Sequence, residues 1–490
     1  MTDFDLSALI SPTLLVIDFI IRILALIIIP RNRKPTAAMA WLLAVFFIPY
    51  VGLLFFLLIG SSKLPKSRRL KQQQINTFIL DSTEGMDLVL REHPWPKWLE
   101  SVVRLNRTLG AMPLVGGNAA TLIGDYNESI AAMTADVNRA ERFVHCEFYI
   151  MSYDVVTADF FDALDNAGKR GVIVRVLLDH VASMRSPRHK ETVAKLNEMH
   201  VQWEFMLPVQ PFKGKYQRPD LRNHRKLLVI DGHVGYMGSQ NMIDRSYNIP
   251  KNIKRGLKWQ DLMTRLHGPI VSGVNAIFIT DWFSETNELL SRETLPIKAD
   301  VMDNPNAPLD CQVVPSGPGF EGENNLRLFL ALLYNAEERI IITSPYFVPD
   351  ESMLYAITTA TQRGVEVQLF VSEIGDQGLV FHAQRSYYEA LLRAGVQIWM
   401  YKAPFILHSK HFTIDDDVAV IGSSNMDIRS FSLNMEVSLM VRGRSFVADM
   451  REIEAGYRAV SRELTLEEWL TRPLRSSVLD NLARLTSGLQ

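Results

Sequence analysis

Residues 224–241 read HRKLLVIDGHVGYMGSQN, and residues 408–425 read HSKHFTIDDDVAVIGSSN. Both stretches follow one pattern, His-x-Lys-x-x-x-x-Asp and then Gly-Ser-x-Asn, with identical spacing. The fixed polar positions are His224, Lys226, Asp231, Ser239 and Asn241 in the first copy, and His408, Lys410, Asp415, Ser423 and Asn425 in the second. A duplicated set of these residue types predicts one symmetric pocket built from two half-sites, and it suits phosphoryl chemistry.

Each copy predicts a β-hairpin. The stretches that carry the histidine and the lysine (222–230 and 407–414) are apolar and β-branched towards their ends, which is typical of strands. Residues two apart on a strand share a face, so each histidine should point the same way as its lysine. A second short apolar run then brings the serine and the asparagine back beside them. The motif aspartates, Asp231 and Asp415, come an odd number of positions further on, at a turn, and we expect them to act as structural anchors within the catalytic motif.

The paired polar sets fit the transfer of a phosphodiester. One imidazole can attack phosphorus and form a phosphohistidine, while the other protonates the leaving alcohol and later deprotonates the incoming one. The two lysines and two asparagines would stabilise the charge on the phosphate oxygens, so no metal ion is required. Arg245 and Arg429 each follow a motif asparagine by four residues, and they could hold either the loop or the phosphate.

Composition limits the other classes of function. The chain has 490 residues and a net charge of −2, which disfavours a polycationic nucleic-acid binder. Its two cysteines, Cys146 and Cys311, lie in strand-like apolar runs and predict no disulfide framework. The sequence has no metal-binding motif of the His-Glu-x-x-His or paired Cys-x-x-Cys type, and no glycine-rich nucleotide loop. We therefore expect neither a metal nor a cofactor.

Two apolar stretches of about 24 residues near the N-terminus, 6–29 and 37–60, are each long enough to cross a bilayer about 30 Å thick. A basic turn joins them, so they predict a transmembrane hairpin; a re-entrant hairpin in one leaflet is the alternative. Asp18 and Arg22 are four residues apart and can pair on one helix face. Basic residues between 63 and 71 outnumber those of the turn, which favours a cytoplasmic catalytic region.

The rest of the chain predicts an α/β fold in two similar halves. In each half two strands flank a helix and precede the motif hairpin, at 142–150, 158–167 and 172–179, and again at 339–347, 353–361 and 365–371. A mixed sheet flanked by helices in each half, with the halves related by a pseudo-twofold axis, would bring the two histidines together. The predicted divisions are a hairpin with a basic flank at 1–72, a connector at 73–110, a first domain at 111–295, and a second domain with a C-terminal helical tail at 296–490.

The paired motifs resemble the HKD motifs of the phospholipase D superfamily, and the chain as a whole is similar to the bacterial cardiolipin synthases of that superfamily. The similarity extends beyond the motifs to Trp259-Gln260-Asp261, to the stretch from Ser344 to Asp350, and to Asn434-Met435-Glu436. It covers nearly the whole chain, as far as about Pro473. The resemblance implies two tandem phospholipase D-like domains.

The resemblance also implies roles for single residues. An acidic residue downstream of each motif is expected to hydrogen-bond the histidine of that motif, which assigns Asp261 to His224 and Glu436 to His408. His224 is implied as the nucleophile, and His408 as the general acid and base. The carboxylates would thus orient the catalytic bases.

These observations predict a phosphatidyltransferase of the bacterial cytoplasmic membrane that passes a phosphatidyl group from one phosphatidylglycerol to another, giving cardiolipin and glycerol. Its expected partners are phosphatidylglycerol and other anionic phospholipids, with no nucleic acid. A phospholipase D or a headgroup-exchange enzyme would use the same residues. A nuclease is disfavoured by the near-neutral charge, and a non-catalytic scaffold by the two intact motifs.

Overall fold

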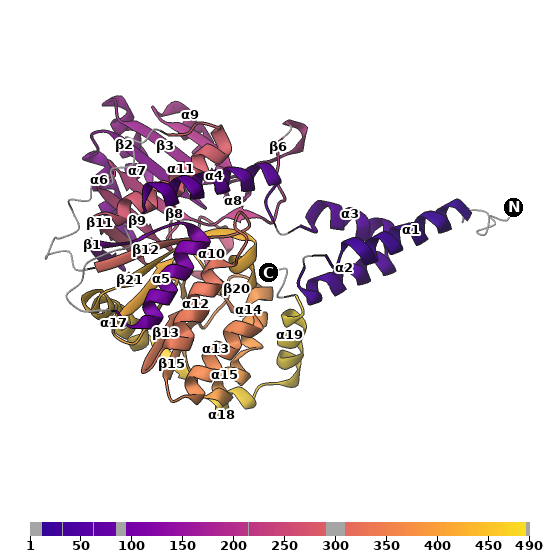
Figure 1. Cartoon of the computed structure of the whole chain (residues 1–490). Helices are drawn as coiled ribbons and strands as arrows, with labels where there is room; N and C mark the ends of the chain where they lie inside the picture. The colour runs from indigo at the N-terminus through magenta and orange to yellow at the C-terminus, as the bar shows by residue number, and fades with distance from the viewer. Residues whose placement is uncertain are drawn as a thin grey trace. The chain divides into compact units, whose positions relative to one another are not determined.

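The computed structural model describes residues 12–31, 33–61, 63–84, 95–213, 215–290 and 309–486. The chain forms two compact units, Met1–Leu64 and Pro65–Gln490 (Figure 1). The predicted boundary between the two halves, at 295 and 296, lies outside the described residues. Both halves belong to the second unit.

The N-terminal unit contains three helices, α1 (Pro12–Ile28), α2 (Pro35–Phe47) and α3 (Pro49–Ile59). The stretch 37–60 is therefore not one helix, as predicted, but parts of two. Proline has no backbone N–H and its ring clashes with the preceding turn, so Pro49 ends α2 and opens α3. No helix in the described part of the chain is long and apolar enough to cross a membrane, so the predicted transmembrane hairpin is not confirmed.

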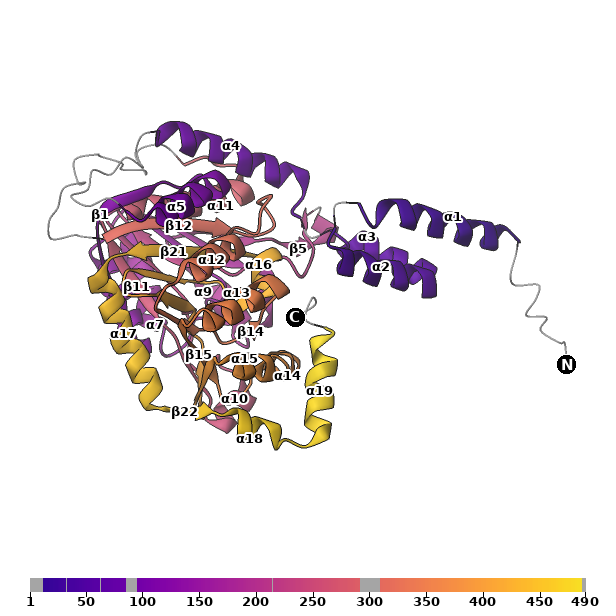
Figure 2. The same cartoon turned by 60° about the horizontal axis from the view of Figure 1, so that its bottom comes forward.

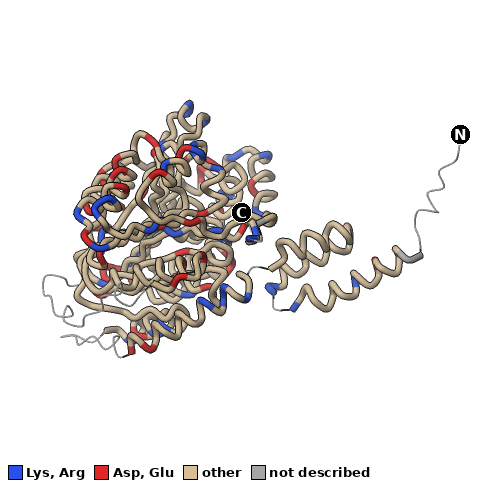
Figure 3. The backbone as a smooth tube through the Cα atoms, turned by 90° about the horizontal axis from the view of Figure 1, so that it is seen from above, with Lys and Arg blue, Asp and Glu red and all other residues tan. Residues whose placement is uncertain are grey.

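The N-terminal helices carry few charges, and Figure 3 draws them almost wholly as uncharged residues. The predicted pair within α1 is present, with Arg22 Nε 2.8 Å from Asp18 Oδ2. Many large apolar side chains of this unit are exposed, among them Phe19, Phe47 and Leu57. The unit thus combines an apolar surface with an ion pair within α1.

One mixed sheet of 16 strands runs through both halves of the second unit, in the order β22-β16-β15-β13-β18-β19-β21-β12-β1-β11-β9-β8-β2-β3-β4, with β7 paired to β21. This confirms the predicted α/β class. The two halves meet where β1 (Leu114–Ile123) pairs antiparallel with β12 (Leu309–Ser316). Helices lie on both faces of the sheet (Figures 1 and 2).

In the first half, β2 (Phe143–Phe148) pairs parallel with β3 (Ile173–Asp179) and antiparallel with β8 (Lys226–Ile230). Alternate side chains of β2 pack against α6 (Tyr126–Asn138) and α7 (Ala158–Lys169) on one face. The intervening side chains face α11, where the ring of His145 stacks on Phe278. The first motif hairpin, β8 and β9, therefore lies in the middle of a sheet covered on both sides.

The second half repeats this plan. β13 (Arg339–Thr343) pairs parallel with β15 (Glu366–Ser372) and antiparallel with β18 (His411–Ile414). Helices α12 (Asn324–Asn335) and α13 (Glu351–Gln362) pack on one face with Ile340 and Ile342. On the other face Ile341 packs with Tyr457 of α17. Both motif hairpins thus lie within the sheet, with side chains packed on both of its faces.

The remaining elements frame these cores. The helices are α4 (Lys66–Ser82), α5 (Lys97–Gly110), α8 (His180–Arg185), α9 (His189–Glu198), α10 (Pro250–Arg255), α11 (Ile270–Thr286), α14 (Gly378–Arg385), α15 (Tyr388–Ala394), α16 (Ile428–Ser432), α17 (Arg444–Ala459), α18 (Leu466–Leu470), α19 (Leu474–Arg484) and the 3₁₀ turn η2 (Pro211–Lys213). The strands are β4 (Gln202–Met206), β5 (Val209–Gln210), β6 (Lys215–Tyr216), β7 (Arg222–Asn223), β9 (Val234–Gly238), β10 (Lys258–Gln260), β11 (Met263–His267), β14 (Phe347–Val348), β16 (Gln397–Tyr401), β17 (Phe405–Leu407), β19 (Val418–Gly422), β20 (Met426–Asp427), β21 (Asn434–Arg442) and β22 (Ser461–Leu464). The segment predicted as a connector, 73–110, therefore contains the second part of α4 and all of α5, while α4 begins within the predicted basic flank.

Candidate active site

The strand that was predicted to carry each motif is interrupted at its histidine. β7 ends at Asn223 and β8 begins at Lys226, while β17 ends at Leu407 and β18 begins at His411. The histidines lie in these gaps because their backbones pair with the opposite half: His224 N–H donates to Met435 O at 2.9 Å, and His408 N–H donates to Gln260 O at 2.7 Å. Each histidine is thereby fixed between the two halves.

The imidazole of His224 contacts groups of the second half. Its Nδ1 lies 3.0 Å from the carbonyl oxygen of Ser423 and 3.0 Å from Glu436 Oε1. A carbonyl oxygen can only accept a hydrogen bond, so Nδ1 carries the proton and Nε2 keeps its lone pair. Ser423 Oγ also donates to the carboxylate of Glu436, which fixes this acid.

The imidazole of His408 contacts groups of the first half. Its Nδ1 lies 2.7 Å from Asp261 Oδ1, and Ser239 Oγ donates to the same oxygen at 2.7 Å. The arrangement is the pseudo-symmetric counterpart of the one around His224. Both motif serines therefore hold a carboxylate.

The histidine–carboxylate pairs are crossed between the halves, and the pairing expected from the sequence was wrong. Glu436 contacts His224, and Asp261 contacts His408. The reason is the strand pairing across the interface, because β7 runs parallel to β21 and β10 runs parallel to β17. Each acid thus lies beside the histidine of the other motif.

The motif lysines are buried beneath the histidines. Lys226 Nζ donates to the carbonyl of His224, and Lys410 Nζ donates to the carbonyl of His408 at 2.6 Å. Burial lowers the pKa of Lys226 well below its usual value. Burial also lowers the pKa of Lys410, to about 8, although four carboxylates, those of Asp261, Glu436, Asp427 and Asp376, oppose the shift. Both amines are thus within electrostatic range of the site acids.

The motif asparagines lie in different hydrogen-bond environments. Asn241 Oδ1 accepts from Ile150 N–H at 3.2 Å, and its Nδ2 donates to Tyr247 Oη at 2.8 Å. Asn425 is buried, and its Oδ1 has no hydrogen-bond partner within the described part of the chain. One amide is held by the fold, and the other keeps unused hydrogen-bonding capacity.

The motif aspartates lie at turns away from the imidazoles. The Asp231 carboxylate accepts from the backbone N–H groups of residues 141, 142 and 143 at 2.7 to 2.9 Å. Asp415 accepts from residues 337, 338 and 339 in the same way. Both have positive φ, 53° and 49°, which aspartate tolerates better than most residues. These bonds tie each motif hairpin to the strand before it.

Electrostatics distinguish the two histidines. Burial lowers the pKa of His224 well below its usual value, and the charges of Lys226 and Lys410 lower it further. Burial also lowers the pKa of His408, but the charge of Asp261 opposes the shift. The neutral form of His224 is therefore favoured over a wide range of pH.

The two acids differ as well. Burial raises the pKa of Glu436 to about 7, against the charge of Lys226 and the hydrogen bond from Ser423. Burial favours a higher pKa for Asp261 too, but the charge of His408 and its hydrogen bond outweigh burial and hold the pKa of Asp261 at about 2. At neutral pH, Asp261 is an anion while Glu436 is partly protonated.

Several residues around the site were missed in the sequence. The ring of Tyr149 lies 4.8 Å from that of His224, and the ring of Tyr247 lies 6.4 Å from that of His408. Arg225 is buried between the motif histidine and lysine, pairs with Asp281, and donates from Nε to Glu436 O at 3.1 Å. The sequence feature that could have identified Arg225 is a cation within an apolar stretch predicted to be a strand.

The two arginines that follow the asparagines differ in their contacts. Arg245 donates to Trp259 O at 3.2 Å and to Gln260 Oε1 at 3.0 Å, so it holds the loop that carries Asp261. Arg429 donates to Asp220 O at 2.6 Å. Of the two roles predicted for these arginines, holding the loop therefore applies to Arg245.

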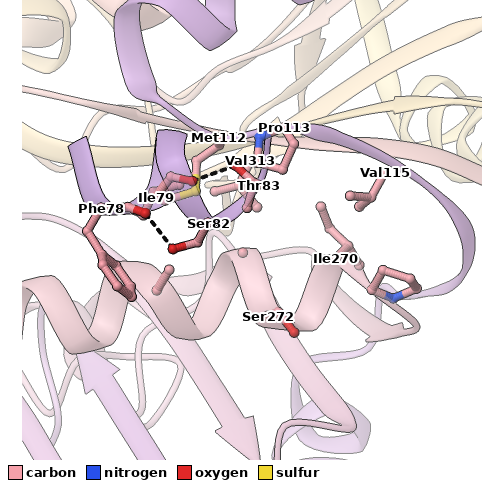
Figure 4. Close-up of a pocket in the computed structure, with 13 residues that line it drawn as sticks. Phe78, Ile79, Ser82, Thr83, Met112, Pro113, Val115, Ile270, Ser272 and Val313 are labelled. Carbon is pink, nitrogen blue, oxygen red and sulfur yellow. Dashed lines mark hydrogen bonds between the residues drawn. The ribbon is translucent and has the colours of Figure 1, made fainter. Parts of the chain in front are cut away.

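An apolar pocket lies away from these residues, between α4 and α11. Phe78 and Ile79 line it on α4, and Ile270 and Ala276 on α11 (Figure 4). The hydroxyl groups of Ser82 and Thr83 donate to carbonyls of α4, Ser82 Oγ to Phe78 O at 2.5 Å and Thr83 Oγ1 to Ile79 O at 2.6 Å. No motif residue lines it. In the described residues no group of three or more histidine, cysteine or acidic side chains is placed to hold a metal ion.

Comparison with known proteins agrees with this geometry. The family model described as "Cardiolipin synthase, PLD-like domain" matches residues 133–282 and 329–455, and the model "Phospholipase_D-nuclease N-terminal" matches residues 20–61. Cardiolipin synthase A of Proteus mirabilis (strain HI4320) is 31% identical over 468 residues, 94% of each chain. Cardiolipin synthase of Geobacillus kaustophilus (strain HTA426) is 31% identical over 471 residues, 95% of this chain and 91% of that one.

Among solved structures, the phosphatidylserine synthase of Haemophilus influenzae Rd KW20 is similar in fold, with a TM-score of 0.60 and 16% identity over 79% of this chain and 99% of that one. The fold, the duplicated motif and the full-length similarity agree with one another. The protein is a phosphatidyltransferase of the phospholipase D type, and the chain belongs to the family of phospholipase D-like cardiolipin synthases.

Proposed function

We propose that this protein makes cardiolipin and glycerol from two molecules of phosphatidylglycerol through a phosphatidyl-histidine intermediate. The crossed pairing carries the proposal, because it gives one site two imidazoles whose Nδ1 atoms are both engaged by a carboxylate. Both Nε2 atoms are then left for chemistry on a substrate. Two buried lysines beside them would supply positive charge for a phosphate, whose own negative charge favours their protonated forms although burial lowers both pKa values.

In the first step Nε2 of His224 attacks phosphorus and the bond from phosphorus to the glycerol oxygen breaks. His408 gives its proton to that oxygen, and glycerol leaves. In the second step His408 takes a proton from a hydroxyl of the second phosphatidylglycerol, whose oxygen attacks phosphorus and releases His224. One phosphodiester replaces another, so the reaction needs no activated nucleotide.

The electrostatics support this division of roles. A nucleophile must be neutral, and the pKa of His224 is lowered by burial and by the nearby lysines. A general acid must be protonated, and the anionic Asp261, with its pKa held at about 2, stabilises the imidazolium of His408. Glu436, with a pKa raised by burial to about 7, stabilises the imidazolium of His224 less strongly.

A lipid assay tests the proposal. Purified protein receives phosphatidylglycerol alone in liposomes, and cardiolipin, glycerol and phosphatidic acid are measured. We expect cardiolipin and glycerol in equal amounts. Phosphatidic acid as the main product would instead identify a phospholipase D, since water would then have taken the phosphatidyl group.

We also propose that the N-terminal helices anchor the protein in the bacterial cytoplasmic membrane, with the second unit in the cytoplasm. Their exposed apolar side chains support this, because a surface of that kind is normally covered by protein or lipid. To test this, a single cysteine is placed either in the basic turn between α1 and α2 or in α4. Whole cells and lysates are then treated with an impermeant maleimide, and labelling of each cysteine is compared. Labelling of the α4 cysteine in whole cells would contradict the cytoplasmic placement.

A further inference from the structure

The surroundings of the two histidines differ in charge although the motifs are symmetric. Beside His224, the negative charge of Asp179 and three positive charges, those of Arg429, Arg222 and Arg185, act on Tyr149. Arg185 belongs to α8, the segment that follows β3. In the second half the segment that follows β15 carries an acid instead, Asp376.

The loop that carries Asp376, residues 373–377, is fastened next to His408. Ser372, at the end of β15, accepts a hydrogen bond from Leu407 N–H at 2.8 Å, one residue before the histidine. Ile374 packs with Tyr247, Trp259 and Ile406, which flank the same histidine. The loop therefore lies on the His408 side of the site.

A short chain of hydrogen bonds orients the carboxylate. Gln377 Nε2 donates to Tyr346 Oη at 3.1 Å, and Tyr346 Oη donates to Asp376 Oδ2 at 2.9 Å. The tyrosine proton is thus already used, while the carboxylate can accept further hydrogen bonds. Within the described ranges no lysine or arginine pairs with Asp376. The Asp376 carboxylate can therefore accept hydrogen bonds from a ligand with hydroxyl groups, while its negative charge repels a phosphate.

The direction of the reaction places such a ligand on this side. With His224 as nucleophile, the leaving alcohol departs on the opposite side of phosphorus, where His408 protonates it. The free hydroxyls of a glycerol headgroup then extend towards the loop. We propose that Asp376, held by Tyr346, binds the free hydroxyls of the glycerol headgroup and so selects a polyol as leaving group and as acceptor.

This inference rests on the proposed transfer between two phosphatidylglycerol molecules. In the second step the acceptor is also a glycerol, and His408 deprotonates it on the same side. One subsite therefore serves both steps, first for the glycerol that leaves and then for the glycerol that attacks.

The test compares two lipids and three proteins. Phosphatidylpropanol has a three-carbon headgroup like phosphatidylglycerol but lacks both free hydroxyls. The rate of headgroup release in a single turnover, with enzyme in excess over lipid, is measured for each lipid with the wild type, Asp376→Ala and Glu373→Ala, because phosphatidylpropanol has no hydroxyl that could act as acceptor in later turnovers. Glu373 is the matched control, since it lies on the same loop but pairs with Arg462 at 2.7 Å.

We expect Asp376→Ala to lose about tenfold or more on phosphatidylglycerol, which is the effect of a charge-assisted hydrogen bond, and less than about twofold on phosphatidylpropanol. Glu373→Ala should keep the wild-type preference. Asp376→Asn keeps the shape and one acceptor, so its rate on phosphatidylglycerol should lie between those of the wild type and Asp376→Ala. It provides a second test of the inference if the alanine variant misfolds.

Equal losses on both lipids, or no loss on either, would overturn the inference while leaving the proposed function in place. A wild type that makes no cardiolipin from phosphatidylglycerol would instead overturn the proposed function, and this inference with it.

Discussion

The crossed pairing makes Asp261→Asn and Glu436→Gln disable different steps. Asp261 acts through His408, so Asp261→Asn should impair proton donation to the leaving alcohol. Glu436 acts through His224, so Glu436→Gln should impair the nucleophile. A lipid with p-nitrophenol as its headgroup separates these effects, because this leaving group needs no general acid.

The structure sets the size of the effect. The pKa of Asp261 falls from 3.8 to about 2 in spite of burial, because of His408 and its hydrogen bond at 2.7 Å. A shift of this size corresponds to roughly 2 to 3 kcal/mol of interaction with the charged carboxylate, or roughly 30- to 160-fold in rate. We expect Asp261→Asn to lose about that much turnover on phosphatidylglycerol.

Each variant is rapidly mixed with the nitrophenyl lipid in the presence of glycerol, which supplies the acceptor hydroxyl for later turnovers, and the release of nitrophenol is recorded. Asp261→Asn should keep a fast burst of about one nitrophenol per enzyme molecule, and then turn over slowly because His408 cannot activate the acceptor. Glu436→Gln should show a slow burst. Thermal unfolding of both variants verifies that they are folded.

The reverse pattern would refute the reasoning. If Glu436→Gln kept the burst and Asp261→Asn lost it, each carboxylate would serve the histidine of its own motif, or the roles of the histidines would be exchanged. Trapping the phosphoenzyme and locating the modified histidine by mass spectrometry distinguishes these two cases.

Three further predictions follow from the same geometry. The acidic limb of kcat/KM should lie below pH 6.5, since burial and the lysines lower the pKa of His224, and a limb above pH 6.5 on the acid side would contradict this. Activity should fall once the general acid His408, whose pKa burial also lowers, loses its proton, and it should fall further as pH rises through about 8, where Lys410 loses its proton. Asp231→Ala removes the acceptor of three backbone N–H bonds and should lower the free energy of unfolding, measured by urea titration, by about 2 to 4 kcal/mol. Asp231→Asn keeps an acceptor at Oδ1 and tolerates positive φ, so it should lower the free energy of unfolding by less. Treatment with EDTA should leave cardiolipin formation unchanged, and a loss that added metal ions restore would show that the lysines are not sufficient for the phosphate charge.

The local parts of the site could be predicted from the sequence. The hairpins follow from the short apolar, β-branched runs and from the turns at Asp231 and Asp415, both of which are short-range signals. The repeat itself predicted that the two halves share one pocket. The break between α2 and α3 at Pro49 could also have been predicted, because proline cannot continue a helix. The long apolar run of 37–60 instead favoured the prediction of one helix.

The crossed contacts could not be predicted in this way. Which histidine meets Asp261 depends on the pairing of β10 with β17, two strands about 145 residues apart in the chain, and no local pattern encodes that choice. The same holds for Asp376, whose position follows from how its loop packs against Tyr247 and Ile406. Spacing along the chain gave the residue types of the site but not their partners.

A duplicated site faces a chemical conflict, since two equal half-sites would give both histidines one pKa, while transfer needs a neutral nucleophile and a protonated acid at the same pH. The motifs are too similar to resolve it. The difference lies one contact further out, where a carboxylate with a pKa of about 2 meets one histidine and a carboxylate with a pKa of about 7 meets the other. Crossing the carboxylates between the halves couples this difference to the interface, so that neither motif has its orienting acid until both halves are folded together.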